Sequence, residues 1–313
     1  MSYSVNAWLL VLGCVTVWYC QAVDHSTDLE WKLWTRRFDK SYATQAEESL
    51  RKTTWLHNRA LVLEHNNRPG VTFRMGLNSL ADQSAANRSR IQLPWARDNR
   101  IPISGRNSHA PAEFDWRKKG VVLPVIDQGQ IGSVLAYVTR DAVSSYGAIH
   151  MGSLFNLSVR RSLTAAETAM LGPVFECVHK IGGLCLAQDY NTSDCQRPTC
   201  KQVGQVDGGR TVTSGDEADL QMAVLKTPVL VAIDASQVSF QMYQAGIYDD
   251  PNCSPTRLDH ALLLVGYGKD SSGNEYWICK NSWGKAWGMQ GYVYMSRNKR
   301  NQCGIASAAT YPV

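Results

Sequence analysis

The hydrophobic positions of this 313-residue chain predict a helical N-terminal third followed by a mixture of helix and strand. Residues 7–19 form an apolar run, and residues 28–66 carry Trp and Leu side chains at helical spacing. Residues 85–110 are polar, rich in arginine and without periodicity, which is typical of an extended connector. Beyond them, the apolar runs at 121–126 and 262–268 predict buried strands, and a buried helix is expected soon after the first of these runs.

The N-terminal apolar run predicts a signal peptide over residues 1–22. These residues carry no charge, and Cys20 and Ala22 satisfy the small-residue rule for cleavage before Val23. No later stretch is long and apolar enough to cross a bilayer, so the mature chain is not expected to span a membrane. We expect the secretory pathway, ending in the lysosome or the extracellular space. Glycosylation sequons agree with that route and lie at Asn87, Asn156 and Asn191.

The formal net charge of +5 is unevenly distributed. Residues 23–109 hold 14 basic and 9 acidic side chains, whereas the remainder of the chain holds 18 of each. Nucleic-acid binding needs a concentrated basic face, and the larger part of the chain is neutral, so no nucleic-acid partner is expected. No metal-ligand spacing and no phosphate-binding loop occur, so no cofactor is expected either.

A narrow stripe lies along the second half of the N-terminal helical region. Its members are three or four residues apart and therefore share one face of a long helix: Glu47, Arg51, Trp55, Asn58, Val62 and Asn66. By itself, this pattern indicates an amphipathic helix that docks on a core. A second spaced element follows at Gly76, Asn78, Leu80 and Asp82.

Both elements resemble the propeptides of cathepsin L-like proteases. The stripe is the ERFNIN pattern with Trp and Val as its usual variants, and the second element is Gly-x-Asn-x-Phe-x-Asp with leucine for phenylalanine. The resemblance implies that residues 23–110 are an inhibitory propeptide of the I29 type, whose tail runs backwards through a substrate cleft. It also implies that residues 111–313 are a papain-like peptidase domain.

The segment QGQIGSVLAY, from Gln128 to Tyr137, resembles QGQCGSCWAF, which surrounds the catalytic cysteine of the papain family. Here Ile131 replaces the first cysteine, Val134 replaces the nucleophile and Leu135 replaces a tryptophan. Valine has no lone pair and no ionisable proton, so it cannot attack a carbonyl. The resemblance therefore predicts the protease scaffold without its nucleophile.

Three other positions match the catalytic apparatus of that family. A lone histidine beside an apolar strand is more often structural than catalytic. However, His260 opens the run HALLLVGYG, and Asn281 lies in YWICKNSWG, as the catalytic histidine and asparagine of cathepsins do. The resemblance also implies that Gln128 takes the place of the glutamine that donates to the oxyanion.

The implied fold is α+β, with a helical domain from about residue 134 to 212 and a β-barrel-like domain that carries His260 and Asn281. The cleft between them is expected to be covered by the propeptide. One region departs from the family: Ala165 and Ala166 stand at two cysteine positions. The cleft-lining glycine pair becomes Thr168 and Ala169, so peptide binding there is expected to be impaired.

Seven of the nine cysteines lie beyond the signal peptide. The resemblance implies a disulfide between Cys253 and Cys303. The sequence leaves open how the other five pair, namely Cys177, Cys185, Cys195, Cys200 and Cys279. Because Cys279 lies in an apolar strand, it is expected to be a buried free thiol rather than a reactive one.

Two functions are consistent with these features. The first is an inactive homologue, a monomer that binds active cathepsins or peptide and protein ligands in its cleft. The alternative is a cysteine-type endopeptidase of the cathepsin L family with residual or altered activity that uses His260. A third possibility is a decaying gene copy whose product merely folds. The sequence alone leaves the physiological partner open.

Overall fold

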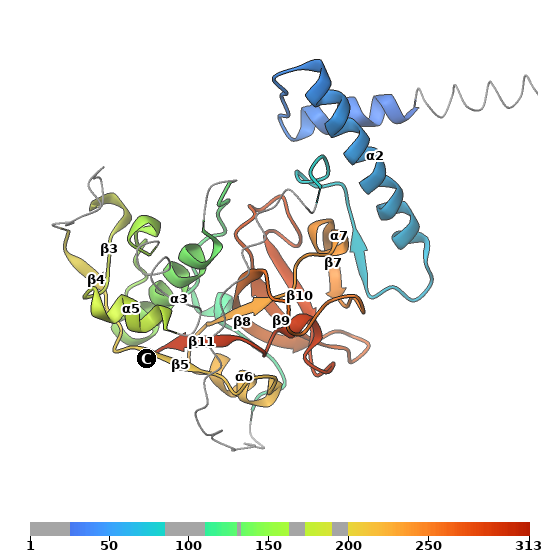
Figure 1. Cartoon of the computed structure of the whole chain (residues 1–313). Helices are drawn as coiled ribbons and strands as arrows, with labels where there is room; N and C mark the ends of the chain where they lie inside the picture. The colour runs from blue at the N-terminus through green and yellow to red at the C-terminus, as the bar shows by residue number, and fades with distance from the viewer. Residues whose placement is uncertain (1–25, 85–109, 130–132, 163–172, 190–199) are drawn as a thin grey trace, which may run out of the picture.

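The computed structural model describes residues 26–84, 110–129, 133–162, 173–189 and 200–313 (Figure 1). Several predictions lie outside these residues: the signal peptide, the sequons at Asn87 and Asn191, and the residues Ile131, Ala165, Ala166, Thr168, Ala169 and Cys195. Within the described residues, no helix is long and apolar enough to cross a membrane.

The N-terminal lobe, residues 26–84, contains two helices and one strand. The first helix covers residues 26–37, and it is followed by α2 (Gln45–Asn67) and β1 (Phe73–Met75). Helix α2 begins where Thr44 accepts a hydrogen bond from the Glu47 amide, and the Glu47 carboxylate accepts one from the Ala43 amide in return. This reciprocal capping satisfies amide groups that have no partner inside the helix.

The predicted stripe is the inner face of α2. Trp55, Asn58 and Val62 are buried, and the other three members are half-buried. Trp55 meets Trp31 and Trp34 of the first helix with ring centres 5.5 and 6.2 Å apart, so the lobe has an aromatic core of its own. Burial of large aromatic side chains is the strongest stabilising contribution available to so small a unit.

The main body is built on a nine-stranded sheet in the order β1-β7-β10-β9-β8-β6-β11-β5, with β2 paired to β8. The bounds are β2 (Phe114–Asp115), β5 (Gly209–Thr211), β6 (Val229–Ile233), β7 (Tyr243–Tyr248), β8 (His260–Lys269), β9 (Glu275–Lys280), β10 (Tyr292–Ser296) and β11 (Ala309–Pro312). All of β8 except Lys269 is buried, which explains its continuous apolar run.

One glycine in β8 is required by a close approach. A Cβ on Gly266 would lie 2.1 Å from the Phe114 carbonyl oxygen of β2. Because no side-chain atom can be accommodated at that distance, the pairing of β2 with β8 depends on glycine at this position.

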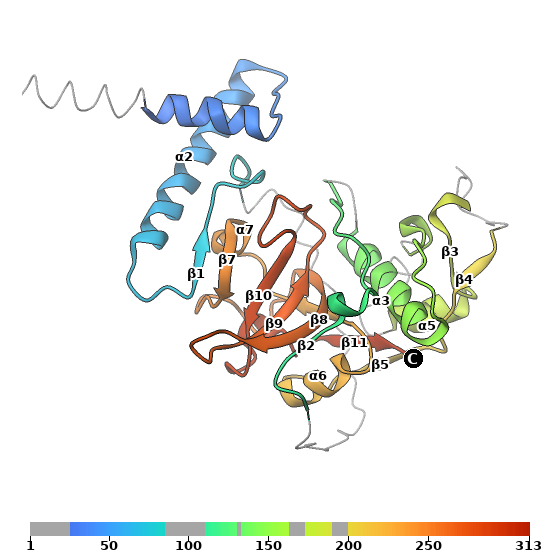
Figure 2. The same cartoon turned by 180° about the vertical axis from the view of Figure 1, so that it is seen from behind.

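The helical part of the main body lies to one side of the large sheet, as the views from both sides show (Figure 2). It contains α3 (Val134–Met151), α5 (Val174–Lys180), η3 (Ala187–Asp189) and a small sheet of β3 (Leu184–Cys185) with β4 (Gln202–Gly204). Residues 159–162 are also helical, up to the end of that described range. Other helices in the described residues are η2 (Trp116–Lys119), α6 (Glu217–Val224), α7 (Val238–Gln241) and η4 (Gln302–Gly304).

The helical side ends close to the expected boundary of about residue 212, since β4 ends at Gly204 and β5, which begins at Gly209, pairs with β11 in the large sheet. One sequence-based expectation is wrong. The apolar run at 121–126 is not a strand, although Leu123 and Val125 are buried. Pro124 lies in the middle of this run and has no amide hydrogen to donate to a sheet. The apolar pattern alone therefore predicted a strand where none forms.

The N-terminal lobe is joined to the main body by its strand. β1 pairs antiparallel with β7, with Phe73 opposite Gly246. A Cβ on Gly246, whose φ is +91°, would lie 2.5 Å from the Thr72 carbonyl oxygen, so glycine is again required. The lobe thus extends the main sheet by one strand.

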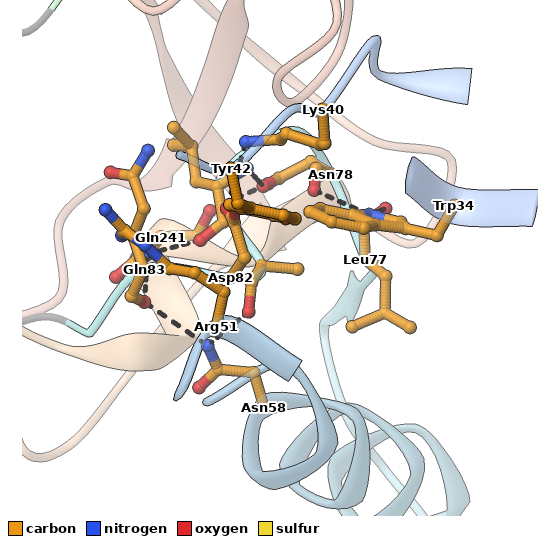
Figure 3. Close-up of polar contacts among 12 residues, drawn as sticks. Trp34, Lys40, Tyr42, Arg51, Asn58, Leu77, Asn78, Asp82, Gln83 and Gln241 are labelled. Carbon is orange, nitrogen blue, oxygen red and sulfur yellow. Dashed lines mark hydrogen bonds and ion pairs between the residues drawn. The ribbon is translucent and has the colours of Figure 1, made fainter. Parts of the chain in front are cut away.

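Polar contacts around the second spaced element complete this joint (Figure 3). Asn58 of α2 donates to the Ala81 and Gln83 carbonyls, and Asn78 donates to the Gln241 carbonyl at the end of α7. The Gln241 amide donates back to Gln83 at 3.0 Å. The side chain of Asp82 accepts from two partners in the same lobe, Lys40 and Tyr42. Asn58, Asn78 and Asp82 therefore connect the segment after β1 to α2, to the end of α7 and to residues 40–42.

Candidate active site

His260 and Asn281 lie side by side, as the sequence predicted for a catalytic pair. His260 is the first residue of β8, and Asn281 directly follows β9, its antiparallel neighbour. Their side chains are hydrogen-bonded, with 2.9 Å between Nε2 and Oδ1. An amide oxygen can only accept, so Nε2 carries the hydrogen, and in the neutral ring Nδ1 keeps the lone pair of a base.

The amide of Asn281 is itself fixed. Its Oδ1 also accepts from the Ser282 backbone amide at 2.8 Å, and its own backbone amide donates to Gly291. Two donors on one oxygen leave the side chain a single orientation. The imidazole is therefore held in one plane and one tautomer.

Aromatic rings surround the histidine. The Trp283 ring centre lies 4.7 Å from that of His260, and Phe240 packs against both. Only 6% of His260 is exposed. Exclusion of water strengthens the bond between His260 and Asn281, since the local dielectric constant is low.

Gln128 is hydrogen-bonded to Ser282, the residue that follows Asn281. Its backbone amide donates to the Ser282 carbonyl at 2.8 Å, and its side-chain Oε1 accepts from the Ser282 hydroxyl. Asp127 forms an isolated bridge with Trp283. Because Oε1 accepts, the nitrogen end of the Gln128 amide is the end that can donate to a ligand.

Val134 is the first residue of α3, and both it and Leu135 are buried. Helix α3 packs against β8, the strand that His260 opens. The N-terminus of a helix favours negative charge, which is where a thiolate would be stabilised. The Val134 side chain brings two methyl groups to that end of the helix and no group that ionises.

Cys279 is a buried free thiol, which agrees with the prediction from its apolar strand. Burial raises the pKa of its thiol far above the usual range. It therefore stays protonated at every physiological pH and is a poor nucleophile.

A buried ionic cluster beneath the site was missed at the sequence level. Lys280 is 2% exposed and lies 2.5 Å from Asp141 of α3, which also binds Arg140. Burial lowers the pKa of Lys280, and Asp141 opposes that effect. The available signal was three charged residues within apolar runs, which are costly to bury unless paired.

The described cysteines form two disulfides. Cys253 is joined to Cys303, the pair that the resemblance implied, and Cys185 is joined to Cys200, which the sequence left open. Cys177 is free and half-buried. In the described part of the chain, no group of three or more His, Cys, Asp or Glu side chains could hold a metal ion. Asn156, the one predicted glycosylation site in that part, is exposed.

Comparison with known proteins gives two family matches. Residues 110–313 match the papain family cysteine proteases, and residues 31–86 match the cathepsin propeptide inhibitor domain (I29). Similar proteins include cathepsin L of Sarcophaga peregrina, 34% identical over 90% of this chain and 92% of the relative. Cysteine proteinase 3 of Dictyostelium discoideum is 36% identical over 90% and 89%.

Solved structures of papain-family precursors have a similar fold. Digestive procathepsin L 3 of Tenebrio molitor superposes with a TM-score of 0.80 at 33% identity, covering 92% of this chain and 99% of that one. The recombinant stem bromelain precursor gives 0.84 at 26% identity, with the same coverage. The family matches, the sequence identities and the superpositions all point to one family. The chain belongs to the papain family of cysteine proteases, among the cathepsin L-like members that carry an I29 propeptide.

Proposed function

We propose that this chain is a catalytically inactive cathepsin L-like homologue that acts as a secreted or lysosomal binding or regulatory protein. The observation that carries the proposal is the residue at position 134. Val134 stands at the nucleophile position of the matching segment and begins α3, and its side chain cannot form a thiolate. The relatives are named as proteinases, so the proposal rests on this chain's own residue.

The expected loss of activity is large. Removal of the nucleophile from a triad enzyme costs roughly 10⁶-fold in turnover, or about 8 kcal/mol of activation free energy. Correct placement of His260 and Asn281 does not compensate, because they orient and deprotonate a nucleophile rather than replace it.

Neither neighbouring candidate supplies a substitute nucleophile. Ser133 precedes α3, and one residue along a helix turns a side chain by about 100°. Cys279 is fully buried in β9, and its thiol is held protonated. The expected direction of its side chain argues against Ser133, and burial of its thiol argues against Cys279.

The partners we propose are active cathepsins, bound through the propeptide, or peptide and protein ligands of the cleft. The chain would act as a monomer in the lysosome or outside the cell. The propeptide is the feature that favours this class of partner, because its inner stripe and its joint to the main body keep their hydrogen bonds.

One observation favours a second candidate, residual or altered hydrolysis. The His260–Asn281 hydrogen bond, 2.9 Å long, keeps the imidazole ready to deprotonate a water molecule. A base alone contributes about 10²–10⁴-fold to a rate, well short of what a complete triad provides. Such an activity would be slow and would depend on His260.

The experiment is a peptidase assay of the matured protein beside His260→Ala and Val134→Cys. We expect no cleavage of cathepsin L substrates above the His260→Ala level. Val134→Cys should restore little, since Leu135 and the altered cleft wall remain. Turnover by the natural chain that His260→Ala abolishes would refute inactivity and establish the second candidate. Labelling of the natural chain by a thiol-directed active-site probe would likewise contradict the proposal.

A further inference from the structure

A cavity of about 590 Å³ lies where the N-terminal lobe meets the main body. Its walls come from the helix over residues 26–37, from α2, from the residues after β1, from β7 and from the loop at 285–290. The candidate active-site residues do not line it. Small-molecule sites usually measure roughly 300–1,000 Å³, so this space is large enough for a small ligand. The lining is more polar than apolar, and its polar groups indicate which ligand would fit.

The wall that α2 contributes includes Trp55, whose indole nitrogen is buried. This nitrogen has no hydrogen-bond acceptor among the described residues. The neighbouring Trp34 indole, by contrast, donates to the Leu77 and Asn78 carbonyls at 3.2 and 3.1 Å (Figure 3). A buried N–H group without an acceptor destabilises a fold. An acceptor oxygen held in the cavity would satisfy the Trp55 donor.

Two side-chain amides line the cavity from the main body. Gln244 of β7 and Gln290 of the loop at 285–290 are both exposed, and neither amide is hydrogen-bonded to a described residue. The Gln244 side chain lies against Gly76, where a Cβ atom would come within 2.9 Å of its Cδ. Glycine at position 76 therefore leaves room for this amide at the cavity wall. Each amide can donate two hydrogen bonds to a ligand.

Positive charge lies at the edge of the same cavity. Arg37 and Lys285 are exposed and line it from opposite halves of the chain, and neither forms an ion pair with a described residue. The acidic residue of the lining, Glu30, is paired with Arg59 at 2.7 Å. Within the described part of the chain, the cavity therefore carries two cations without a counter-charge, and an anion would complement them.

The available groups of this lining are mainly hydrogen-bond donors, namely an indole, two amides, a guanidinium and an ammonium. A hydrocarbon offers them no acceptor, and a neutral polyol offers no charge. These donors come from the first helix, α2, β7 and the loop at 285–290. A carbon skeleton with several carboxylates can place oxygens on separate walls, whereas an inorganic anion has a single centre.

We propose that this cavity binds a small organic polycarboxylate. Its carboxylates pair with Arg37 and Lys285, and its remaining oxygens accept from Trp55 Nε1 and from the amides of Gln244 and Gln290. This site is separate from the candidate active site and does not depend on the proposed function. Because the walls come from both halves of the chain, the complete site exists only while the propeptide is docked. By linkage, the ligand holds the propeptide in place.

The test is titration calorimetry of the full chain with tricarballylate, at neutral pH and constant ionic strength. We expect saturable binding. Arg37→Gln with Lys285→Gln should weaken it about tenfold, the scale of two partly exposed charge contacts. Trp55→Phe keeps an aromatic ring but removes the N–H group, and the loss of one hydrogen bond to a charged ligand should also weaken binding about tenfold. Hydrogen exchange of the β1 amides should slow when the ligand is bound, because it contacts both sides of the junction.

Matched controls make the result specific. Lys118→Gln with Arg257→Gln removes the same charge from exposed positions outside the cavity. Trp31→Phe makes the same ring change in the aromatic core, at a residue that does not line the cavity. Both controls should bind tricarballylate as the natural chain does. The neutral triamide of the same skeleton should not bind.

Several outcomes would overturn the proposal. They are the absence of saturable tricarballylate binding, equal binding of the triamide, and equal weakening in the control variants. Undiminished binding by Trp55→Phe or by the Arg37 and Lys285 double variant would do the same, as would unchanged exchange of β1. The double variant changes only exposed side chains, so it remains informative even if Trp55→Phe fails to fold.

Discussion

At the scale of single residues, the candidate active site is held together by hydrogen bonds among its side chains and backbone. His260 is oriented by Asn281, and Gln128 is anchored to Ser282. These contacts fix geometry, and they also stabilise the fold because every partner is buried or half-buried. Their retention therefore does not by itself require a reaction.

The buried ionic cluster gives a stability prediction. Asp141→Asn removes the negative charge between Lys280 and Arg140 and leaves two buried cations uncompensated. We expect a loss of about 3–5 kcal/mol in the free energy of unfolding. Asp249→Asn is the matched control, because its pair with exposed Lys299 should contribute less than about 1 kcal/mol. Urea denaturation measures both, and equal losses would contradict the cluster's importance.

A second residue-scale prediction concerns thiol reactivity. Cys279 is fully buried, and burial raises the pKa of its thiol, whereas Cys177 is half-buried. Iodoacetamide should modify Cys177 in the native protein and reach Cys279 only after unfolding. Mass spectrometry of the digested protein reads out both sites. Modification of native Cys279 at a rate similar to that of Cys177 would show that β9 opens or that the thiol is accessible.

At the scale of elements, α2 performs two tasks with one stripe. Its apolar members build the aromatic core of the lobe, and its two asparagines bind backbone in the segments that follow. Asn66 accepts from the Met75 amide and donates to the Met75 carbonyl, so it occupies an edge of β1. Helix and strand are thus held in register by side chains rather than by the chain connection alone.

This division predicts the effect of removing one asparagine. Asn58→Ala leaves the Ala81 and Gln83 carbonyls without their donor inside a buried joint. We expect a loss of about 1–3 kcal/mol, typical of unsatisfied buried polar groups. His57→Ala, the exposed neighbour, should have little effect. Hydrogen exchange of residues 76–84 should accelerate in the first variant alone; unchanged exchange would show that the contact is dispensable.

At the scale of the whole molecule, the propeptide and the main body share one sheet through β1 and β7. An active protease needs such an attached segment to remain silent before maturation. Under the proposed function, this chain needs the segment only for folding or for binding a partner.

We predict that residues 23–110, produced alone, fold and inhibit an active cathepsin L-like enzyme. The Trp31, Trp34 and Trp55 core gives this segment interior packing of its own. The excess of five positive charges among residues 23–109 should make inhibition weaken as salt rises. Inhibition assays at low and high ionic strength are the measurement. Absence of inhibition below about 10 µM, roughly 7 kcal/mol of binding, would indicate a folding aid instead.

The sequence by itself determined much of this architecture. The spacing of Glu47 to Asn66 predicted the inner face of α2, because helical periodicity is local and survives any packing arrangement. The apolar run from Ala261 predicted β8, and the motifs around His260 and Asn281 predicted their pairing. That Val134 has no ionisable group is likewise known from the sequence, whatever the fold.

Other features were decided only by tertiary structure. The apolar run at 121–126 became irregular, and β5 joined the large sheet, because strand pairing depends on partners far along the chain. The cluster of Arg140, Asp141 and Lys280 and the pairing of Cys185 with Cys200 depend on distances that no local pattern encodes. The cavity between the propeptide and the main body is formed by surfaces from both parts, so it exists only once they pack together.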